Sequence, residues 1–286
     1  PPPIHRNRMN HWHLARGYRF SGIVSGLRNE IERRDLAVIV SDTPAQAAGV
    51  FTQNQVCAAP VQLSRQRLPR SDARAIVVCS GNANACTGEQ GFRDAERMAE
   101  LVAIELGCAP EQVLVASTGV IGRPLPMPVL EAGIPRATAA VSDSIAGFQH
   151  AAQAILTTDT CIKVATRELA LSGGLVHISG FAKGAAMIGP NMATMLGFIL
   201  TDAAVAAPAL EQLLRRAVAD TFNCISVEGH TSTNDTVFLL ANGAGSHLHG
   251  DDARQFETAV HDVCGDLARQ IAADAEGANH LITIDS

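Results

Sequence analysis

A short turn-like segment that contains a threonine is the strongest candidate for chemistry in this sequence. Residues 189–199 read Gly-Pro-Asn-Met-Ala-Thr-Met-Leu-Gly-Phe-Ile, a turn signal that runs into an apolar, strand-like stretch. An internal threonine is a poor nucleophile because its hydroxyl has no base of its own. If the chain is cut before Thr194, the freed α-amine, with a pKa of roughly 7.7–8.0, can accept the hydroxyl proton. Small Ala193 leaves room for the acyl shift that such a cut requires, although the same pattern is also ordinary for a packed strand.

Four other segments carry side chains that could bind or polarise a substrate. The pair Thr118-Gly119 follows a strand-like run and could direct a hydroxyl and a backbone N–H at an oxyanion, or form a plain turn. Thr157 opens a Thr-Thr-Asp-Thr run that could hold a polar ligand or only its own loop. Lys183, between two apolar runs, could hold a carboxylate as a point charge. Glu276 lies at the C-terminal end of a long helix, where the helix dipole disfavours a carboxylate. Glu276 could therefore bind an ammonium group, or it could simply be an exposed residue at the end of the helix.

Two further polar segments favour structural roles. Residues 80–88, between a strand and a helix, predict a turn in which Thr87 or its neighbour caps the helix. Residues 228–236 have the hydrogen-bonding groups to order a buried loop, chiefly through Asn234 and Asp235. His247 and His249 lie two residues apart without acidic or thiol partners nearby in the sequence, so we expect no metal site.

Composition excludes several classes of protein. The chain has 286 residues, a formal charge of −6 and no basic stretch interleaved with aromatic residues, so no nucleic-acid partner is expected. No apolar run reaches the roughly 18 residues that a membrane span needs. The seven cysteines are scattered and form no C-x-x-C pair, which favours reduced thiols and a cytoplasmic protein. Signatures of P-loop, dinucleotide-binding, α/β-hydrolase and zincin proteins are absent from the sequence.

Periodicity predicts an α+β protein. Helical patterns cover residues 92–106, about 144–156, 210–218 after Pro208, and about 252–274. Strand-like runs are short, β-branched and bounded by turn residues; they cover 36–41, 75–80, 113–117, 175–179, 196–200, 224–227, 236–241 and 281–284. Because these strands neither alternate strictly with helices nor cluster apart, we expect mixed sheets covered by helices. Residues 1–16 are predicted to form a disordered leader. Residues 123–128 and 133–141 are predicted to form a long irregular connection, or excursion, between secondary-structure elements.

These segments, in this order, closely resemble the ornithine acetyltransferase (glutamate N-acetyltransferase) family of arginine biosynthesis. The resemblance runs from about residue 17 to the end of the sequence. The matching stretches are residues 34–37, 47–52, 81–88, 117–122, 157–160, 184–196, 231–237, 241–243 and 276–278.

The resemblance implies a self-cleaving precursor with a layered αββα sandwich fold. Cleavage between Ala193 and Thr194 would leave residues 17–193 as an α-chain part and 194–286 as the N-terminal part of a β chain, assembled as an α2β2 heterotetramer. The family continues beyond the point that corresponds to Ser286.

The resemblance also implies site residues and a reaction. Thr194 is the acetyl-carrying nucleophile, Thr118 and Gly119 form the oxyanion hole, and Thr157, Lys183 and Glu276 bind substrate together with Thr194. Thr194 takes acetyl from N-acetylornithine and passes it to glutamate. No cofactor is implied, although acetyl-CoA serves some members as donor.

Two other hypotheses stay open. The first keeps the self-cleaved threonine but predicts hydrolysis, as in related aminopeptidases; measuring whether glutamate or water accepts the acetyl group separates the two. The second is that the chain is an inactive fragment or a structural partner of another subunit. Exposed apolar strand edges would favour it.

Overall fold

The strands of the computed structural model form one continuous mixed sheet in the described residues, which are 12–28, 32–187, 189 and 195–284. The order of hydrogen-bonded strands is β4-β3-β2-β8-β7-β6-β5, and β1 pairs additionally with β2. The strands are β1 (Tyr18–Ile23), β2 (Leu36–Phe51), β3 (Arg70–Asn82), β4 (Val113–Val120), β5 (Lys163–Leu171), β6 (Gly174–Lys183), β7 (Leu196–Thr201) and β8 (Thr236–Ala241). The helices are α1 (Ala59–Arg67), α2 (Gly88–Leu106), α3 (Met127–Ala139), α4 (Ile145–Ala154), α5 (Ala207–Ala219) and α6 (Asp252–Ala273).

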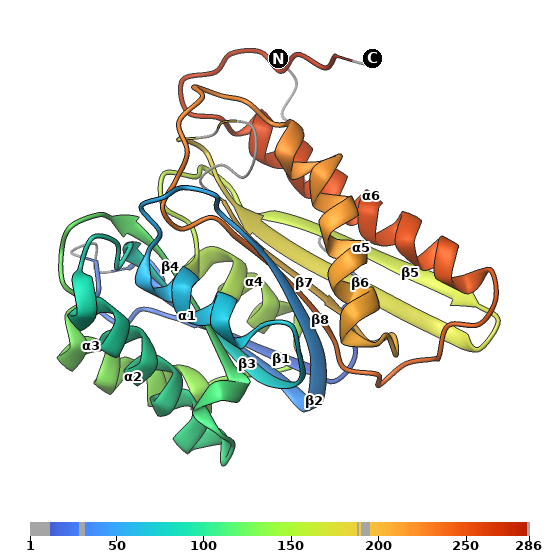
Figure 1. Cartoon of the computed structure of the whole chain (residues 1–286), viewed down its shortest axis with the longest axis horizontal. Helices are drawn as coiled ribbons and strands as arrows, with labels where there is room; N and C mark the ends of the chain where they lie inside the picture. The colour runs from blue at the N-terminus through green and yellow to red at the C-terminus, as the bar shows by residue number, and fades with distance from the viewer. Residues whose placement is uncertain (1–11, 29–31, 188, 190–194, 285–286) are drawn as a thin grey trace.

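The long strand β2 joins two halves of this sheet. Its first part pairs with β1 and β3, and its second part, Gln46 to Phe51, pairs with β8. The register with β3 is irregular between Val40 and Ala47, and such irregularities bend and twist a strand. One strand therefore serves both halves, and the sheet turns from one half into the other (Figure 1).

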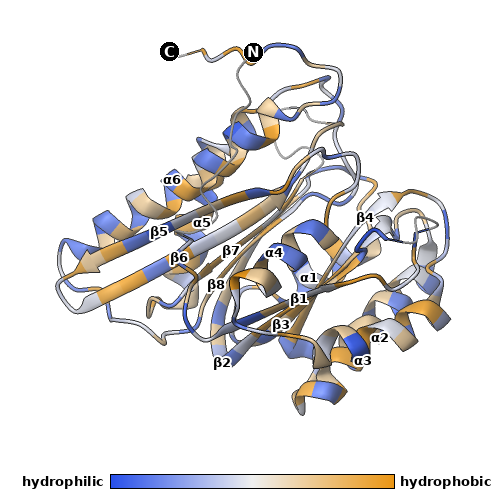
Figure 2. Cartoon of the chain, turned by 180° about the vertical axis from the view of Figure 1, so that it is seen from behind, coloured by the Kyte–Doolittle hydropathy of each residue, from blue (hydrophilic) through white to orange (hydrophobic). Residues whose placement is uncertain are grey.

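Three apolar cores separate the layers. One lies between the β5–β8 half and helices α5 and α6, and a second lies between β2–β4 and helices α2 and α3. The third is shared by the inner faces of both halves, together with β1 and α4. It contains Phe148, whose ring meets that of Phe181 edge to face, and Phe198, whose ring is tilted against Phe181. Helices thus cover the outside of both halves, while strands β7 and β8 between the layers are mainly apolar (Figure 2). This arrangement confirms the predicted α+β sandwich.

The four predicted helices are present with nearly the predicted limits. Helix α2 ends at Gly107, whose φ of 62° suits a residue without a Cβ. Helix α4 begins after Ser144, whose hydroxyl accepts a hydrogen bond from the Gly147 amide at 3.0 Å. No helix in the described parts of the chain is both long and apolar enough to cross a membrane.

The predicted excursion over residues 123–128 and 133–141 was wrong, because residues 127–139 form α3. Proline is compatible with the first turn of a helix, and Pro128 occupies that turn. Pro135 lies inside the helix, at a cost, but Leu130, Ile134 and Ala137 are fully buried. Burial of this apolar face outweighs the local propensity.

Two predicted strands and part of the predicted leader also differ from the structure. The apolar run 224–227 lies in a 3₁₀ turn and a loop, and residues 281–284 are unpaired, with Ile282 80 % exposed. A β-branched run makes a strand only where a partner strand is available. Residues 12–16 are ordered rather than disordered, because Trp12 packs edge-on against Phe148 and Ala15 is buried. Residues 1–11 lie outside the described part of the chain.

Both edge strands are covered by polar side chains at mid-strand. The Ser64 hydroxyl of α1 accepts from the Val115 amide at 2.9 Å and donates to its carbonyl at 2.8 Å. On β5, the Gln270 side chain of α6 bonds both the amide and the carbonyl of Val164 at 3.0 Å. These contacts satisfy the backbone amide and carbonyl of Val115 on β4 and of Val164 on β5, which would otherwise be open at the edge of the sheet.

Candidate active site

Five predicted site residues from four separate segments line one open cavity of about 930 Å³. Thr118 and Gly119 end β4, Lys183 ends β6, Thr157 follows α4, and Glu276 lies beyond α6. The structure therefore brings together the described residues that were predicted to form the oxyanion hole or to bind substrate. Ala193 and Thr194 lie outside the described residues, but β7 begins at Leu196, which is the register partner of Lys183.

Close packing of β3 against β4 fixes the Thr118-Gly119 pair. Gly119 has a φ of 135°, and a Cβ there would lie 2.3 Å from the backbone carbon of Gly81. Only glycine fits this position. The Asn234 side-chain amide donates to the carbonyls of Ser117 and Ala83 at 2.8 and 2.6 Å. These bonds anchor the end of β4 and confirm the structural role predicted for Asn234.

Lys183 is a buried cation at the cavity wall. Its side chain is almost fully enclosed, and Nζ donates to the Thr157 hydroxyl at 2.8 Å. Burial lowers the pKa of Lys183 to about 8, against the raising effect of the Asp159 and Asp235 carboxylates. The ammonium is therefore positively charged at neutral pH and close to losing its proton.

A second buried lysine holds the loop that carries Thr157. Asp159 accepts hydrogen bonds from Lys163 Nζ at 2.6 Å and from the Gly184 amide at 2.7 Å. Lys163 also pairs with Asp274, just past α6. Burial raises the pKa of Asp159, but the charges of Lys183 and Lys163 outweigh it and hold this pKa below its usual value. The ion pairs tie the 157–160 loop to the end of α6.

Glu276 and three arginines give the cavity its charge. Glu276 is exposed, and its amide donates to the Ala185 carbonyl at 2.7 Å, which turns the segment after α6 toward the end of β6. Arg28, Arg33 and Arg123 also line the cavity. Together with Lys183 they outnumber the carboxylates of Asp159 and Glu276, so the cavity favours an anionic ligand with one positive group. These arginines were not predicted, because Arg28 and Arg33 lie in a stretch of mixed charge and Arg123 lies in a proline-rich stretch.

Asp235 is a buried carboxylate directly beside the start of β7. Its Oδ1 accepts a hydrogen bond from the Met195 amide at 3.0 Å, whereas Oδ2 has no partner in the described parts of the molecule. Burial raises the pKa of Asp235 to about 7. A purely structural role was predicted; the structure adds that Asp235 holds the residue that follows Thr194.

Two other sequence candidates lie outside the cavity wall. Thr87 precedes α2, but its hydroxyl donates to the Asn84 side chain at 2.7 Å and makes no capping bond to the helix, so the predicted cap was wrong. His247 and His249 lie in a surface loop with ring centroids 6.4 Å apart.

Known proteins share this fold and much of this sequence. The L-aminopeptidase D-Ala-esterase/amidase of Ochrobactrum anthropi, described as a variant of the Ntn-hydrolase fold, matches 93 % of this chain at a TM-score of 0.54 and 12 % identity, which shows the fold alone. The crystal structure of the arginine biosynthesis bifunctional protein ArgJ of Bacillus halodurans has a TM-score of 0.59 and 39 % identity over 63 % of this chain and 92 % of its own.

The ArgJ family model matches residues 19–285. The arginine biosynthesis bifunctional protein ArgJ of Thermosynechococcus vestitus is 47 % identical over 96 % of this chain and 68 % of its own length. That of Symbiobacterium thermophilum is 51 % identical over 90 % of this chain and 64 % of its own length. The fold is thus that of an Ntn-hydrolase-like α+β sandwich. The chain belongs to the ArgJ family and spans about two thirds of the length of these relatives.

Proposed function

We propose that this chain carries the acetyl-transfer site of a glutamate N-acetyltransferase of arginine biosynthesis. The observation that carries the proposal is the single cavity lined by Thr118, Gly119, Thr157, Lys183 and Glu276, at the end of the sheet where β7 begins. One ArgJ relative of known structure, the Mycobacterium tuberculosis ornithine acetyltransferase, is described in complex with ornithine; it is 35 % identical over 62 % of this chain.

The proposed reaction is a double displacement at Thr194. Its hydroxyl attacks the acetyl carbonyl of N-acetylornithine, and its own α-amine takes the proton. Thr118 and the Gly119 amide stabilise the tetrahedral oxyanion, which collapses and releases ornithine with that proton on its leaving amine. The amine of glutamate then attacks the acetyl ester, regenerates the Thr194 hydroxyl and leaves as N-acetylglutamate.

Charged residues of the cavity fit both amino acids. Lys183 binds a substrate carboxylate, and Glu276 binds a positive group such as an ammonium. The arginines at the cavity wall attract glutamate, which has one more carboxylate than ornithine.

The chemistry requires cleavage between Ala193 and Thr194, which frees the α-amine of Thr194. We also propose an α2β2 assembly and acetyl-CoA as a second donor. The seven free thiols fit a cytoplasmic location, where they stay reduced.

The test is acetyl transfer from labelled N-acetylornithine, with and without glutamate. We expect N-acetylglutamate as product, and its loss in Thr194→Ala but not in Thr258→Ala, an exposed threonine on α6. Release of free acetate at the same rate with or without glutamate would identify a hydrolase instead. Transfer that survives in Thr194→Ala would refute the proposal.

A further inference from the structure

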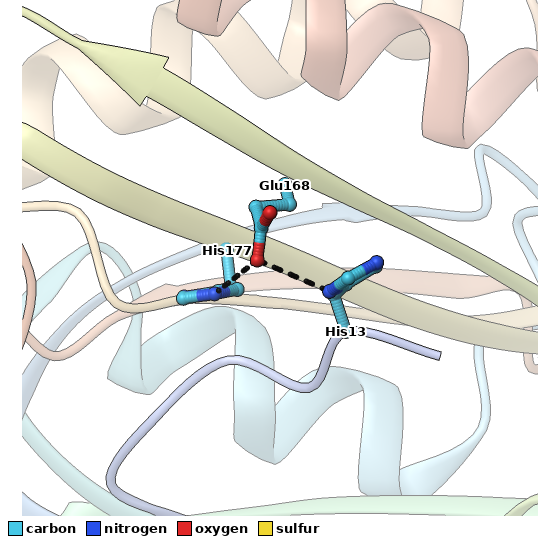
Figure 3. A group of neighbouring side chains, drawn as sticks. All are labelled: His13, Glu168 and His177. Carbon is cyan, nitrogen blue, oxygen red and sulfur yellow. Dashed lines mark hydrogen bonds and ion pairs between the residues drawn. The ribbon is translucent and has the colours of Figure 1, made fainter. Parts of the chain in front are cut away.

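Two histidines and a glutamate meet on the surface away from the cavity (Figure 3). His13 Nδ1 and His177 Nε2 each lie 3.1 Å from Glu168 Oε2. The three atoms are all within 4.8 Å of one another. They belong to the segment before β1, to β5 and to β6.

The sheet register brings the three side chains together. Glu168 and His177 are directly opposite each other in the antiparallel pair β5–β6, where side chains share one face. The segment before β1 crosses this face, because the His13 amide donates to the Thr166 hydroxyl at 3.3 Å and the Ala15 amide to the Ser179 hydroxyl at 3.2 Å. The contact therefore follows from the fold rather than from one flexible side chain.

A buried carboxylate orients the His177 ring. Asp202 is fully buried, and its Oδ2 lies 2.9 Å from His177 Nδ1 and 2.7 Å from Arg16 Nε. Its Oδ1 accepts from the His177 backbone amide at 2.7 Å. When Nδ1 donates its proton to Asp202, the Nε2 lone pair of the neutral ring points at Glu168. Metal-bound histidines are held in this way by a carboxylate on the other ring nitrogen.

This tautomer makes the cluster a site for a cation. The His177 Nε2 lone pair, the Glu168 carboxylate and His13 Nδ1 then converge, and a cation between them can accept all three as ligands. Zinc lies roughly 2.0–2.2 Å from nitrogen and oxygen ligands in a tetrahedron, and two such ligands are about 3.3 Å apart. The observed separations of 3.1 Å fit this spacing.

We propose that His13, Glu168 and His177 bind a divalent transition-metal ion of the zinc class, with Asp202 as the orienting carboxylate. Two imidazole nitrogens and one carboxylate suit zinc, nickel or copper better than magnesium or calcium, which prefer oxygen ligands alone. Water completes the tetrahedron on the exposed side, where His13 and Glu168 are 45 % and 39 % exposed.

The proposed metal is structural rather than catalytic. His177 and Lys183 are six residues apart on β6, which corresponds to about 20 Å along a strand. An ion at this place joins the segment before β1 to β5 and β6. The bound ion should therefore stabilise the sandwich against unfolding without taking part in acetyl transfer.

Calorimetric titration of EDTA-stripped protein with Zn²⁺ tests the site. We expect one equivalent to bind, a higher Tm with Zn²⁺, and binding weakened at least about tenfold in His13→Gln and Glu168→Gln. The matched control is His247→Gln, an exposed histidine outside the cluster, which should bind as the wild type does.

Cysteines are the main competing zinc ligands, so Co²⁺ supplies the second readout. Coordination by the proposed residues gives d–d absorption without a thiolate charge-transfer band. The proposal is overturned if that band appears, if both cluster variants bind zinc as tightly as the wild type, or if the wild type does not bind zinc.

Discussion

At the residue scale, two buried ionisable groups determine how the cavity responds to pH. Lys183 and Asp235 face the same region from β6 and from the loop before β8, and burial shifts their pKa values toward each other, to about 8 and about 7. Groups with pKa values displaced in this way are common at functional sites. Each shift leads to a separate prediction.

Loss of the Lys183 charge should weaken substrate binding at alkaline pH. Because its pKa is about 8, the ammonium that binds a carboxylate is lost as the pH rises through this value. We expect KM to increase above about pH 8. In Lys183→Met, KM should be raised about tenfold or more at pH 7, and the alkaline rise should be absent, so that the two proteins converge above about pH 8. The measurement is the pH dependence of KM; an unchanged alkaline rise in Lys183→Met would assign it to another group.

Asp235 should make the protein less stable as the pH rises toward neutrality. Its pKa is raised to about 7 in the folded state, so the folded chain holds this proton more tightly than the unfolded chain. The stabilisation is fully present below the unfolded pKa of about 3.9 and is lost as the pH rises through about 7. The free energy of unfolding of Asp235→Asn should therefore increase relative to wild type between about pH 4 and 7. Urea unfolding measures this, and parallel pH curves for the two proteins would contradict it.

At the element scale, the parallel pair β3–β4 positions the proposed oxyanion hole. Gly81 and Gly119 are register partners, and the end of β4 is anchored by Asn234 from the loop before β8. Three segments that are far apart in the sequence thus set the direction of one backbone amide.

Gly119→Ala should damage both stability and transfer. The new Cβ would lie 2.3 Å from the backbone of Gly81, and a φ of 135° is strained for alanine. We expect the free energy of unfolding to fall by about 1–3 kcal/mol and the rate of acetyl transfer to fall about 100-fold or more. Gly122→Ala is the matched control, since Gly122 also has a positive φ of 81° but open space around it. Equal effects of the two substitutions on transfer would show that Gly119 has no special role.

Long amphipathic helices and buried strands were predictable from periodicity, whereas elements fixed by tertiary contacts were not. Helix α2 has a complete apolar face and a terminal glycine, so its sequence alone defines it. Helix α3 contains Pro135, and β5 is an edge strand with charged Arg167 and Glu168, so neither has a clear pattern. Their structure depends on the layers against which they pack.

Site residues were predictable where the sequence context was unusual. Lys183 between apolar runs, and the Thr118-Gly119 pair after a buried strand, both line the cavity. The arginines of the cavity wall were missed because surface arginines are common. The cluster of His13, Glu168 and His177 was missed because its members are joined only by the sheet register and by the crossing of the first segment.

At the scale of the whole molecule, the fold places the proposed site residues at one end of the sandwich. The end of β6, the start of β7 and the loop before β8 lie side by side through the pairings Lys183 with Leu196 and Leu196 with Thr236. The segments before and after the proposed cleavage point therefore belong to adjacent strands of one sheet. Two chains produced by a cut at Thr194 would remain held together by these pairings and by the shared apolar cores.

Mass spectrometry of the purified protein after incubation with N-acetylornithine tests the central claim most directly. We predict two chains separated between Ala193 and Thr194, and an acetyl group on the peptide that begins with Thr194, removed when glutamate is added. Thr194→Ala should give a single chain without the acetyl group. A wild-type chain that remains intact, or an acetyl group on any other residue, would contradict the assignment of Thr194 as the acetyl carrier.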